Sequence, residues 1–315
     1  MRGMGDRDGG VRVKDQAQQI RARPLGPDDE YGVICHRARR PSRSNSKILH
    51  HFSSDGILPH IGYNTLMQER LRGQFGIRSG GFDASAAWIT DAALLKAHAD
   101  LAGQPSGEAL DLCCGTGRVG RTLQKAGWTV LGLDLTPAMV ELASDHFPVK
   151  KGPAEKIPFE SGRFGLVCCR QSFQFVDVPQ VLAEVKRVLA PGGKLVLSLT
   201  VPFSGADHDW LRAVHLAKQP LLKSFFTAQD LRDLLGAAGF AVEDTAVLRV
   251  RESIDRWMAN APELDQTVRE KVISMVRDAP APYREARQVA VENGEVCEDW
   301  NWVVLRAVPH GPVSG

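Results

Sequence analysis

The sequence has no apolar run long enough to cross a membrane and no marked excess of charge of one sign. A membrane-spanning helix needs roughly 20 consecutive apolar residues, and no stretch of the 315 residues approaches that length. The 39 Lys and Arg residues nearly balance the 37 Asp and Glu residues, so the formal net charge is +2. We therefore expect no membrane span and find no electrostatic argument for a dedicated nucleic-acid-binding protein.

The sequence also lacks the cysteine spacings that are typical of zinc sites and disulfide frameworks. Four of its six cysteines form two directly adjacent pairs, Cys113 with Cys114 and Cys168 with Cys169, and both pairs lie inside apolar runs. We interpret them as small buried strand residues and expect no metal site. Reduced thiols suit the cytoplasm, and the first ten residues contain no apolar signal region. We therefore expect a cytoplasmic protein.

Residues 1–55 differ in composition from the rest of the chain. They are rich in Arg, Gly, Pro and Ser and show no sustained apolar period, which is typical of a disordered extension. Within them, "HRARRPSRSNSK" (36–47) is strongly basic. It is either a contact for an anionic partner or, as we expect, a solvated tail. The sequence leaves open whether this extension is native to the chain, with Met67 as an alternative start.

The remaining residues predict an α/β architecture. Residues 56–104 predict a helical N-terminal cap, because their large apolar residues recur at helical spacing. In residues 105–252, continuous apolar runs alternate with amphipathic segments. This alternation predicts a doubly wound, mostly parallel, Rossmann-like sheet of seven strands that is covered on both faces. Residues 253–298 predict a helical insertion or lid, and residues 299–310 predict a final antiparallel strand.

Local signals mark two helix starts in this α/β core. Thr136 precedes Pro137, and proline is favoured at the first helical position, directly after a capping threonine. Thr227 stands three residues before Asp230, which is the spacing of a capping box. We therefore expect one helix to begin directly after Thr136 and another directly after Thr227.

The stretch "ALDLCCGTGRVG" follows the first predicted core strand and carries Gly115, Gly117 and Gly120 in the order G-x-G-x-x-G. In an open parallel sheet, ligands bind at the carboxyl ends of the strands, where this loop would lie. The glycines alone would also fit a dinucleotide. Asp111 argues against NAD, because its carboxylate would repel a pyrophosphate and attract a cationic amine. Asp134 ends the next strand and is placed to accept both hydroxyls of a ribose.

Four segments, taken together in order and spacing, carry a resemblance to a known family. They are "LDLCCGTGRVG", "LGLDLTPAMVELA", "GPAEKIPFESGRFGLV" and "VLAEVKRVLAPGGKLVLS". From about residue 108 to 245, the chain resembles the class I S-adenosylmethionine-dependent methyltransferases. The resemblance is to the branch that includes the ubiquinone- and menaquinone-biosynthesis enzymes and many small-molecule methyltransferases. It implies S-adenosylmethionine as the cofactor.

The resemblance also implies roles for matching residues. Gly115 and Gly117 would line the methionine part of the cofactor, and Asp111 would lie near its amino-acid moiety. Asp134 would hold the ribose hydroxyls. The implied cofactor-binding residues are Asp111, Cys113, Gly115, Thr116, Gly117, Asp134, Leu135, Met139, Ala154, Glu155 and Gln171.

The adenine segment departs from the family's pattern. The resemblance implies that Leu135, Met139 and the Ala154 backbone meet the adenine. Where relatives often show Gly-Asp-Ala, this chain reads Gly-Pro-Ala, so the carboxylate that would meet the adenine amine is absent and Glu155 is its candidate substitute. Relatives also often carry Asp where Gly165 stands, which predicts a less firmly fixed entry to that strand.

The sequence favours a small-molecule acceptor over a nucleic acid. Enzymes that methylate nucleobase amino groups typically carry an (Asp/Asn)-Pro-Pro-aromatic motif after the fourth strand, where this chain has "RQSFQF". Cytosine-C5 enzymes need a nucleophilic cysteine there, whereas Cys168 and Cys169 lie within the strand. Segments expected beyond the carboxyl ends of the strands offer aromatic rings that either suit an aromatic or lipophilic acceptor or pack the lid on the sheet. These are Phe203, Trp210, Phe225, Phe226, Trp257 and Tyr283.

No general base is evident from the sequence. His208 and His215 titrate in the right range for this work, but a surface position among solvated acids is the alternative interpretation. Gln171 and Gln174 follow the fourth core strand and are candidates to orient a substrate oxygen. A base is needed only if the attacking atom carries a proton at the working pH.

We therefore expect a methyltransferase that uses S-adenosylmethionine and methylates an O, N or C atom of a small aromatic or lipophilic acceptor. Two alternatives remain. One is an RNA or protein methyltransferase that docks through the basic extension, and the other is a methyltransferase-like fold that binds the cofactor without methyl transfer. The sequence identifies neither the acceptor nor the oligomeric state.

Overall fold

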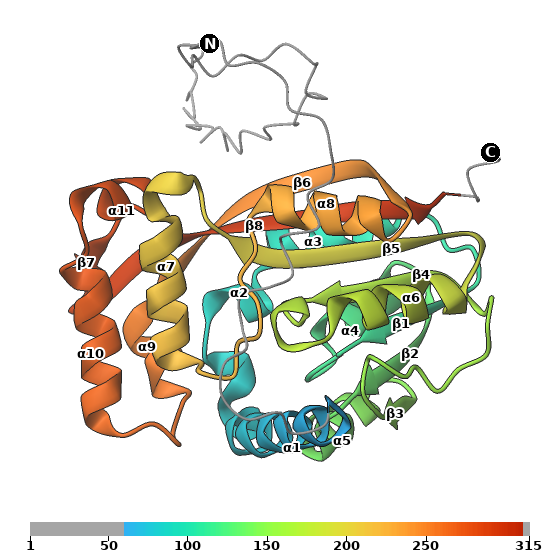
Figure 1. Cartoon of the computed structure of the whole chain (residues 1–315), viewed down its shortest axis with the longest axis horizontal. Coiled ribbons are helices and arrows are strands. Elements are labelled where there is room, and N and C mark those ends of the chain that lie inside the picture. Colours follow the sequence, from blue (N-terminus) through green and yellow to red (C-terminus); the bar gives the residue numbers. More distant parts are fainter. Residues whose placement is uncertain (1–59, 311–315) are drawn as a thin grey trace, which may run out of the picture. The chain divides into compact units, whose positions relative to one another are not determined.

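The computed structural model describes residues 60–310, which form the α/β unit that is coloured in Figure 1. The predicted basic extension, residues 1–55, lies outside the described residues. No helix within residues 60–310 combines the length and apolar character that a membrane crossing requires. Eight strands of this part of the chain form one sheet.

The sheet is mostly parallel, as the alternation of segments predicted. Its strands follow the order β3-β2-β1-β4-β5-β8-β6, and the short strand β7 pairs with β8 outside this path. The β5 and β6 strands both run antiparallel to β8, and the neighbours among β1 to β5 are parallel. The predicted seven-stranded fold is confirmed, with β7 as a short addition. The strands are β1 Glu108–Leu112, β2 Thr129–Asp134, β3 Val149–Lys151, β4 Phe164–Arg170, β5 Leu189–Val201, β6 Phe240–Ser253, β7 Ala290–Glu292 and β8 Glu295–Pro309.

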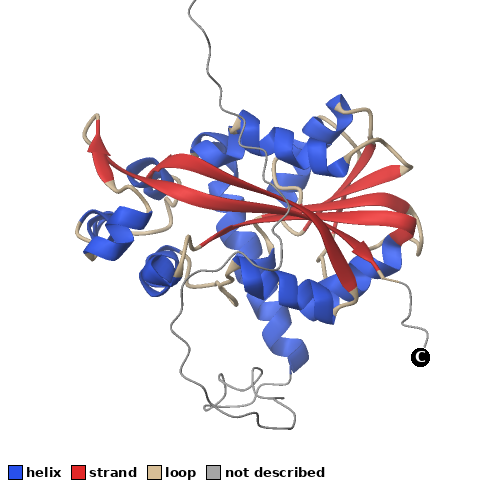
Figure 2. Ribbon diagram, turned by 90° about the horizontal axis from the view of Figure 1, so that it is seen from above, coloured by secondary structure: helices blue, strands red, loops and turns tan. Residues whose placement is uncertain are grey.

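Helices cover both faces of this sheet (Figure 2). One hydrophobic core joins the strands to α6 and α8, and a second core joins them to α3, α4 and α5. Successive strand residues point to opposite faces, so Cys169 lies in the first core and Cys168 in the second. Both thiols are buried, as predicted. The helices are α3 Ala92–Ala102, α4 Arg118–Lys125, α5 Pro137–Ser144, α6 Val178–Val188 and α8 Ala228–Ala237.

The two predicted helix starts are present, but they are built differently. The Thr227 hydroxyl accepts a hydrogen bond from the Asp230 amide at 3.1 Å, and the Asp230 carboxylate accepts one from the Thr227 amide at 2.8 Å. This is the reciprocal arrangement of a capping box. Thr136 occupies the N-cap position of α5 but makes no side-chain cap hydrogen bond. There the fixed φ of Pro137 favours the helix start.

The segment before β1 is helical and packs on the sheet. It contains α1 (His60–Arg78), the 3₁₀ helix η1 (Ser79–Ala84), α2 (Ala87–Thr90) and α3. The Trp88 ring of α2 lies 5.1 Å from the Trp302 ring of β8. Glu252 of β6 accepts hydrogen bonds from the Ala87 and Trp88 amides at 2.8 and 2.6 Å. The carboxylate of β6 therefore satisfies amides in the first turn of α2, which no helical carbonyl can reach.

Strands β6 and β8 extend beyond the parallel strands and lead to a separate group of helices (Figures 1 and 2). A third hydrophobic core, which includes Leu211, Met258, Val272 and Tyr283, holds this group together. It combines the predicted helical insertion with a helix from the connection after β5. We call this group the lid; its helices are α7 Gly205–Lys218, α9 Ile254–Ala259, α10 Gln266–Arg277 and α11 Ala281–Ala286.

Gly165, where relatives often carry aspartate, is a point of close backbone approach. A Cβ built on Gly165 would lie 2.2 Å from the Ser106 carbonyl oxygen, well inside the distance at which atoms can pack. The glycine therefore fixes the entry of β4 against the segment before β1, and the expectation that it leaves this entry less fixed is wrong.

Candidate active site

A cavity of about 1030 Å³ opens at the carboxyl ends of β1, β2 and β4. Its walls come from the glycine loop after β1, the start of α5, the segment 152–155, the residues after β4, and the helical segment before the sheet. Of the predicted cofactor-binding residues, only Gly117 does not line it. The predicted residues that line it are Asp111, Cys113, Gly115, Thr116, Asp134, Leu135, Met139, Ala154, Glu155 and Gln171.

The glycine loop depends on its three glycines for different reasons. Gly115 and Gly117 have φ values of 53° and 81°, which residues with a Cβ rarely adopt. A Cβ on Gly115 would meet no atom within 4 Å, so the loop leaves open space at that position. A Cβ on Gly120 would lie 2.4 Å from the Phe147 ring. Gly120 therefore allows α4 to pack closely on its neighbours, and Gly115 lets a ligand approach the backbone.

Asp111 lies beneath this loop with its side chain almost fully buried. Its Oδ2 accepts a hydrogen bond from the Gly120 amide at 2.7 Å, which ties the strand to the first turn of α4. Burial raises the pKa of Asp111 to about 7, and the Gly120 hydrogen bond and the charge of Arg170 offset part of this rise. The carboxylate therefore has both a structural partner and a place in the cavity wall.

Asp134 ends β2 and turns its carboxylate toward the same cavity. Its Oδ2 accepts a hydrogen bond from the Gly115 amide at 2.9 Å, and its Oδ1 accepts one from the Thr136 amide at 2.8 Å. Burial raises its pKa, against these hydrogen bonds. Because a carboxylate has about four acceptor positions, Asp134 can hold the loop in place and still accept from a bound hydroxyl.

The sequence analysis missed Arg170, which lines the cavity behind Asp111. Its guanidinium lies 5.0 Å from the Trp88 ring and donates to the Trp88 and Ile89 carbonyls at 3.4 Å. Burial lowers its pKa to about 10 while the charge of Asp111 opposes the shift. The sequence did contain a signal for this residue, because Arg170 is the one charged residue of β4 and stands at the carboxyl end of that otherwise apolar strand.

The segment that the resemblance assigns to the adenine lies at the cavity wall. The segment from Gly152 to Glu155 contributes lining residues, as do Leu135 and Met139. The Glu155 Oε1 accepts a hydrogen bond from the Asp177 amide at the start of α6, at 3.1 Å. One of its oxygens is therefore engaged by the protein, and the other is available to a ligand amine.

A second cavity of about 650 Å³ adjoins the first. Its lining includes α7 and α9 of the lid together with α1, η1 and the residues after β4. The residues that line both cavities are Phe75, Phe82, Trp88, Gln171 and Phe175. A molecule in the second cavity would therefore lie against the same side chains as a molecule in the first.

The four candidate catalytic residues are distributed between these cavities and the surface. Gln171 lines both cavities with a φ of 53°, and its Oε1 accepts a hydrogen bond from the Thr200 amide at 2.9 Å. Gln174 and His215 line the second cavity. Burial lowers the pKa of His215 to about 3, so its imidazole is neutral near pH 7. His208 pairs with Asp209 at 2.8 Å and lines neither cavity.

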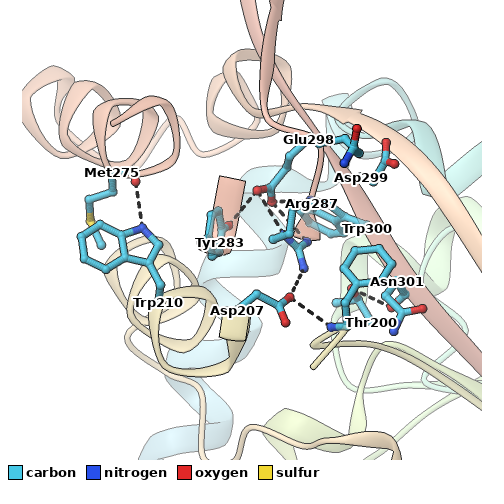
Figure 3. Close-up of polar contacts among 12 residues, drawn as sticks. Thr200, Asp207, Trp210, Met275, Tyr283, Arg287, Glu298, Asp299, Trp300 and Asn301 are labelled. Atoms are coloured by element: carbon cyan, nitrogen blue, oxygen red, sulfur yellow. Dashed lines mark hydrogen bonds and ion pairs between the residues drawn. The ribbon is translucent and has the colours of Figure 1, made fainter. Parts of the chain in front are cut away.

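The lid aromatics mostly pack the lid. Of the six predicted rings, Trp257 alone lines either cavity. The indole of Trp210 donates to the Met275 carbonyl at 2.8 Å, and the Tyr283 hydroxyl donates to Glu298 at 2.7 Å (Figure 3). Phe225 also packs in the lid core and Phe226 packs on the core of the sheet, whereas Phe203 lies 4.1 Å from the Arg249 guanidinium. For four of these rings, packing is therefore the interpretation that agrees with the structure.

The residues of the first cavity fit S-adenosylmethionine. Asp134 offers a carboxylate for the ribose, Leu135 and Met139 offer apolar surface, and Asp111 offers a carboxyl group whose ionised form a cationic ligand would stabilise. The open space at Gly115 leaves room for the chain of the ligand. Among residues 60–310, no group of three or more His, Cys, Asp or Glu side chains is arranged to hold a metal ion.

Comparison with known proteins agrees with this geometry. A family model described as a methyltransferase domain matches residues 110–197. An uncharacterized methyltransferase of Synechocystis sp. is 36% identical over 155 residues, which cover 45% of this chain and 71% of that protein. The chain belongs to the class I S-adenosylmethionine-dependent methyltransferases. The resemblance seen in the motifs is confirmed, and the family's cofactor is S-adenosylmethionine.

Two further relatives of this methyltransferase have specific names. A 2-phytyl-1,4-naphtoquinone methyltransferase of Thermosynechococcus vestitus is 33% identical, with 42% of this chain and 71% of that protein covered. A malonyl-[acyl-carrier protein] O-methyltransferase of Alcanivorax borkumensis is 32% identical, with 44% and 49% covered. The chain thus spans about half the length of some curated relatives that it matches. The YcgJ protein of Bacillus subtilis shares the fold, with a TM-score of 0.62, 18% identity, and 69% and 98% covered.

Proposed function

We propose that this methyltransferase transfers a methyl group from S-adenosylmethionine to an O, N or C atom of a small aromatic or lipophilic acceptor. The observation that carries the proposal is the pair of adjoining cavities with five lining residues in common. The first cavity takes the cofactor and the second takes the acceptor. The shared wall, which includes Trp88 and Gln171, is then the place where donor and acceptor meet.

The residues of the chain supply binding, positioning and exclusion of water. Asp134 accepts hydrogen bonds from the ribose while it holds the Gly115 amide, and Asp111 attracts the cationic end of the cofactor. The aromatic rings of Phe75 and Trp88 keep water away from the reacting atoms. When bound, S-adenosylmethionine would supply a sulfonium methyl to an electron pair of the acceptor, and the electrons of the broken S–C bond would stay on sulfur. Such a reaction depends mainly on alignment in a desolvated site.

The role of Gln171 is to orient the acceptor. Its side-chain oxygen is held by the Thr200 amide, so its amide N–H₂ group is the part that can donate to an acceptor oxygen. Because burial keeps His215 neutral, that imidazole can accept or donate one hydrogen bond without adding charge. We assign a general base to neither residue, since an acceptor that is already ionised needs none.

The name of the phytylnaphthoquinone methyltransferase supports an aromatic, lipophilic acceptor for this chain too. An RNA or protein acceptor is the second candidate, with the basic extension as its docking surface. Deletion of residues 1–55 separates the two. Methylation of a small molecule by the shortened chain supports our proposal, whereas loss of activity on a macromolecule after the deletion supports the alternative. We further propose that the enzyme works in the cytoplasm, where its free buried thiols remain reduced.

The first experiment is a calorimetric titration with S-adenosylmethionine, S-adenosylhomocysteine and NAD, repeated on Asp134→Ala. Micromolar binding of both adenosyl ligands, lost in the variant and absent for NAD, supports the assigned cofactor site. Asp145→Ala is the control, because Asp145 is exposed just after α5. Binding of NAD alone would contradict the proposal. An acceptor screen that monitors S-adenosylhomocysteine formation then tests methyl transfer, and binding without turnover on any acceptor would support the non-catalytic alternative.

A further inference from the structure

Lys218 is a buried lysine whose amino group has no partner of opposite charge within ion-pair distance. Its side chain is 4% exposed, and its Nζ donates to the Trp257 carbonyl and lies 3.8 Å from the centre of the Trp257 ring. No carboxylate among residues 60–310 lies within ion-pair distance of it. An ammonium group has three N–H donors, so two of them remain. Burying such a charge without a counter-ion is costly.

The second cavity, which Lys218 lines, has basic side chains in its wall and no carboxylate. Arg78 and Lys218 both line it, and no Asp or Glu does. The charge of Arg78 is already matched, because Arg78 pairs with Glu263 and donates to the Gln219 side-chain oxygen at 3.0 Å. Glu252 is buried nearby but accepts from the first amides of α2. Lys218 is therefore the cation that is left for a ligand.

Two further polar atoms of this cavity have no partner. The Nε2 of His215 and the Oε1 of Gln174 are buried and make no hydrogen bond within the described part of the chain. Both residues line the second cavity. Buried polar atoms of this kind are normally satisfied, so the wall around Lys218 holds polar atoms that no group of the described chain pairs with.

Aromatic rings form much of the rest of the wall. The His215 ring lies 5.4 Å from the Trp257 ring and 5.6 Å from the Trp300 ring, and Phe75, Phe82 and Trp88 face the cavity from the side of the sheet and α1. These rings pack on one another, and their free faces and edges offer apolar surface to an aromatic ligand. The cavity thus combines one unpaired basic group with several aromatic surfaces.

We propose that the second cavity binds the methyl acceptor and that this acceptor is a planar aromatic acid, whose anionic group pairs with Lys218. The inference rests on the proposed function in that it names the acceptor class for the same site. The ring of the acceptor lies against the aromatic part of the cavity wall, and the reacting atom points toward the wall that both cavities share. Burial holds the pKa of Lys218 well below its ordinary value, and an anion beside it restores the charged form.

The test compares acids with their uncharged amides on the full chain without cofactor. The probes are 4-hydroxybenzoate, indole-3-carboxylate and 1-naphthoate, each titrated by calorimetry beside its primary amide. We expect at least one acid to bind ten-fold or more tightly than its amide. The preference falls to about two-fold or less in Lys218→Met and is largely kept in Lys218→Arg. Lys271→Met is the matched control, because Lys271 is an exposed lysine on α10 of the same lid, and it retains the preference.

Two results would overturn the inference. One is equal affinity for every acid and amide, or no binding of any probe. The other is an unchanged preference in Lys218→Met when circular dichroism shows a folded protein. S-adenosylhomocysteine is titrated separately into each variant. Failure of that ligand to bind the wild type, with the acid preference intact, would overturn the methyl-transfer proposal and leave the anion-binding cavity established.

Discussion

The carboxylate of Asp83 accepts a hydrogen bond from the Thr116 hydroxyl at 2.6 Å and forms an ion pair with Arg118, also at 2.6 Å. Asp83 belongs to η1, whereas Thr116 lies in the glycine loop and Arg118 begins α4. One side chain therefore joins the helical segment before the sheet to the loop that lines the first cavity. Because Thr116 and Phe82 both line that cavity, the contact couples the two walls of the cofactor site.

Removal of this contact is expected to lower the affinity for the cofactor more than it lowers the stability of the fold. In Asp83→Ala, the loop loses a partner for Thr116 and for Arg118, but Arg118 and Asp83 are partly exposed, so water can replace the carboxylate. We expect the Kd for S-adenosylhomocysteine to rise about three- to ten-fold. Titration calorimetry measures this change. Asp100→Ala, which removes an exposed carboxylate paired with Lys96 on α3, should leave the Kd unchanged, and equal effects of the two variants would count against the coupling.

A methyl group added at Gly120 is expected to destabilise the protein. The new Cβ would lie 2.4 Å from the Phe147 ring, and overpacking of this kind costs about 1–3 kcal/mol in the free energy of unfolding. Urea denaturation of Gly120→Ala measures the loss. Gly236→Ala is the control, since a Cβ there meets no atom within 4 Å and a helix favours alanine over glycine. Phe147→Leu combined with Gly120→Ala should restore part of the lost stability, and an unaffected midpoint in Gly120→Ala alone would refute the close contact.

Burial of His98 is expected to make the protein less stable in mild acid. Its ring nitrogens lie 2.7 Å from the Leu94 carbonyl and the Ser198 hydroxyl, and burial, with the charge of Arg170, lowers its pKa from 6.5 to about 3. As the pH falls, His98 therefore becomes protonated at a higher pH in the unfolded chain than in the folded protein. The stability that neutral His98 contributes is present above pH 6.5 and is lost as the pH falls toward 3, by about 1 kcal/mol between pH 7.5 and 5.5.

Thermal unfolding from pH 7.5 to 5.5 tests this expectation by comparing His98→Gln with the wild type. The glutamine cannot titrate, so the difference in stability between wild type and variant should shrink as the pH falls. His146→Gln replaces an exposed histidine and should follow the wild-type curve. If the stability of the wild type and that of His98→Gln changed in parallel with pH, His98 would be accessible to protons in the folded protein, which would contradict its burial.

The sequence predicted the features that local chemistry determines. Apolar runs separated by amphipathic segments identified the parallel strands, and the spacing of Thr227 and Asp230 identified a capping box that the structure contains. The glycine loop and Asp134 could be placed at one end of the sheet, because the carboxyl ends of parallel strands meet there. These inferences need only residue order and the geometry of regular elements.

Contacts between distant segments could not be predicted in the same way. Arg170 and Trp88 are 82 residues apart, and nothing in either segment alone indicates that they meet at the cavity. His208 and His215 looked equivalent in sequence, yet α7 presents one near the surface and buries the other at a cavity wall. The direction in which a helix face points depends on tertiary packing, which a single sequence does not specify.

The lid is held to the extended strand β8 by a buried network of charges around Arg287 (Figure 3). Arg287 pairs with Asp207 and with Glu298, each at 3.1 Å, and all three side chains are at most 1% exposed. Glu298 also accepts hydrogen bonds from the Tyr283 hydroxyl and the Trp300 indole at 2.7 and 2.9 Å. Asp207, in turn, caps the start of α7. The cation therefore neutralises two carboxylates that water does not reach.

Loss of this cation should be strongly destabilising, because the two carboxylates would remain buried and unmatched. We expect Arg287→Met to lower the free energy of unfolding by about 3–5 kcal/mol, measured by urea denaturation at pH 7.5. Arg284→Met removes an exposed arginine from α11, the helix whose C-cap residue is Arg287, and should change stability by less than about 0.5 kcal/mol. The double variant Arg287→Met with Glu298→Gln should regain part of the loss, because the amide keeps an acceptor oxygen for the Tyr283 hydroxyl and carries no charge. If the double variant were less stable than Arg287→Met alone, the cost would come from lost packing of the arginine side chain and not from an uncompensated charge.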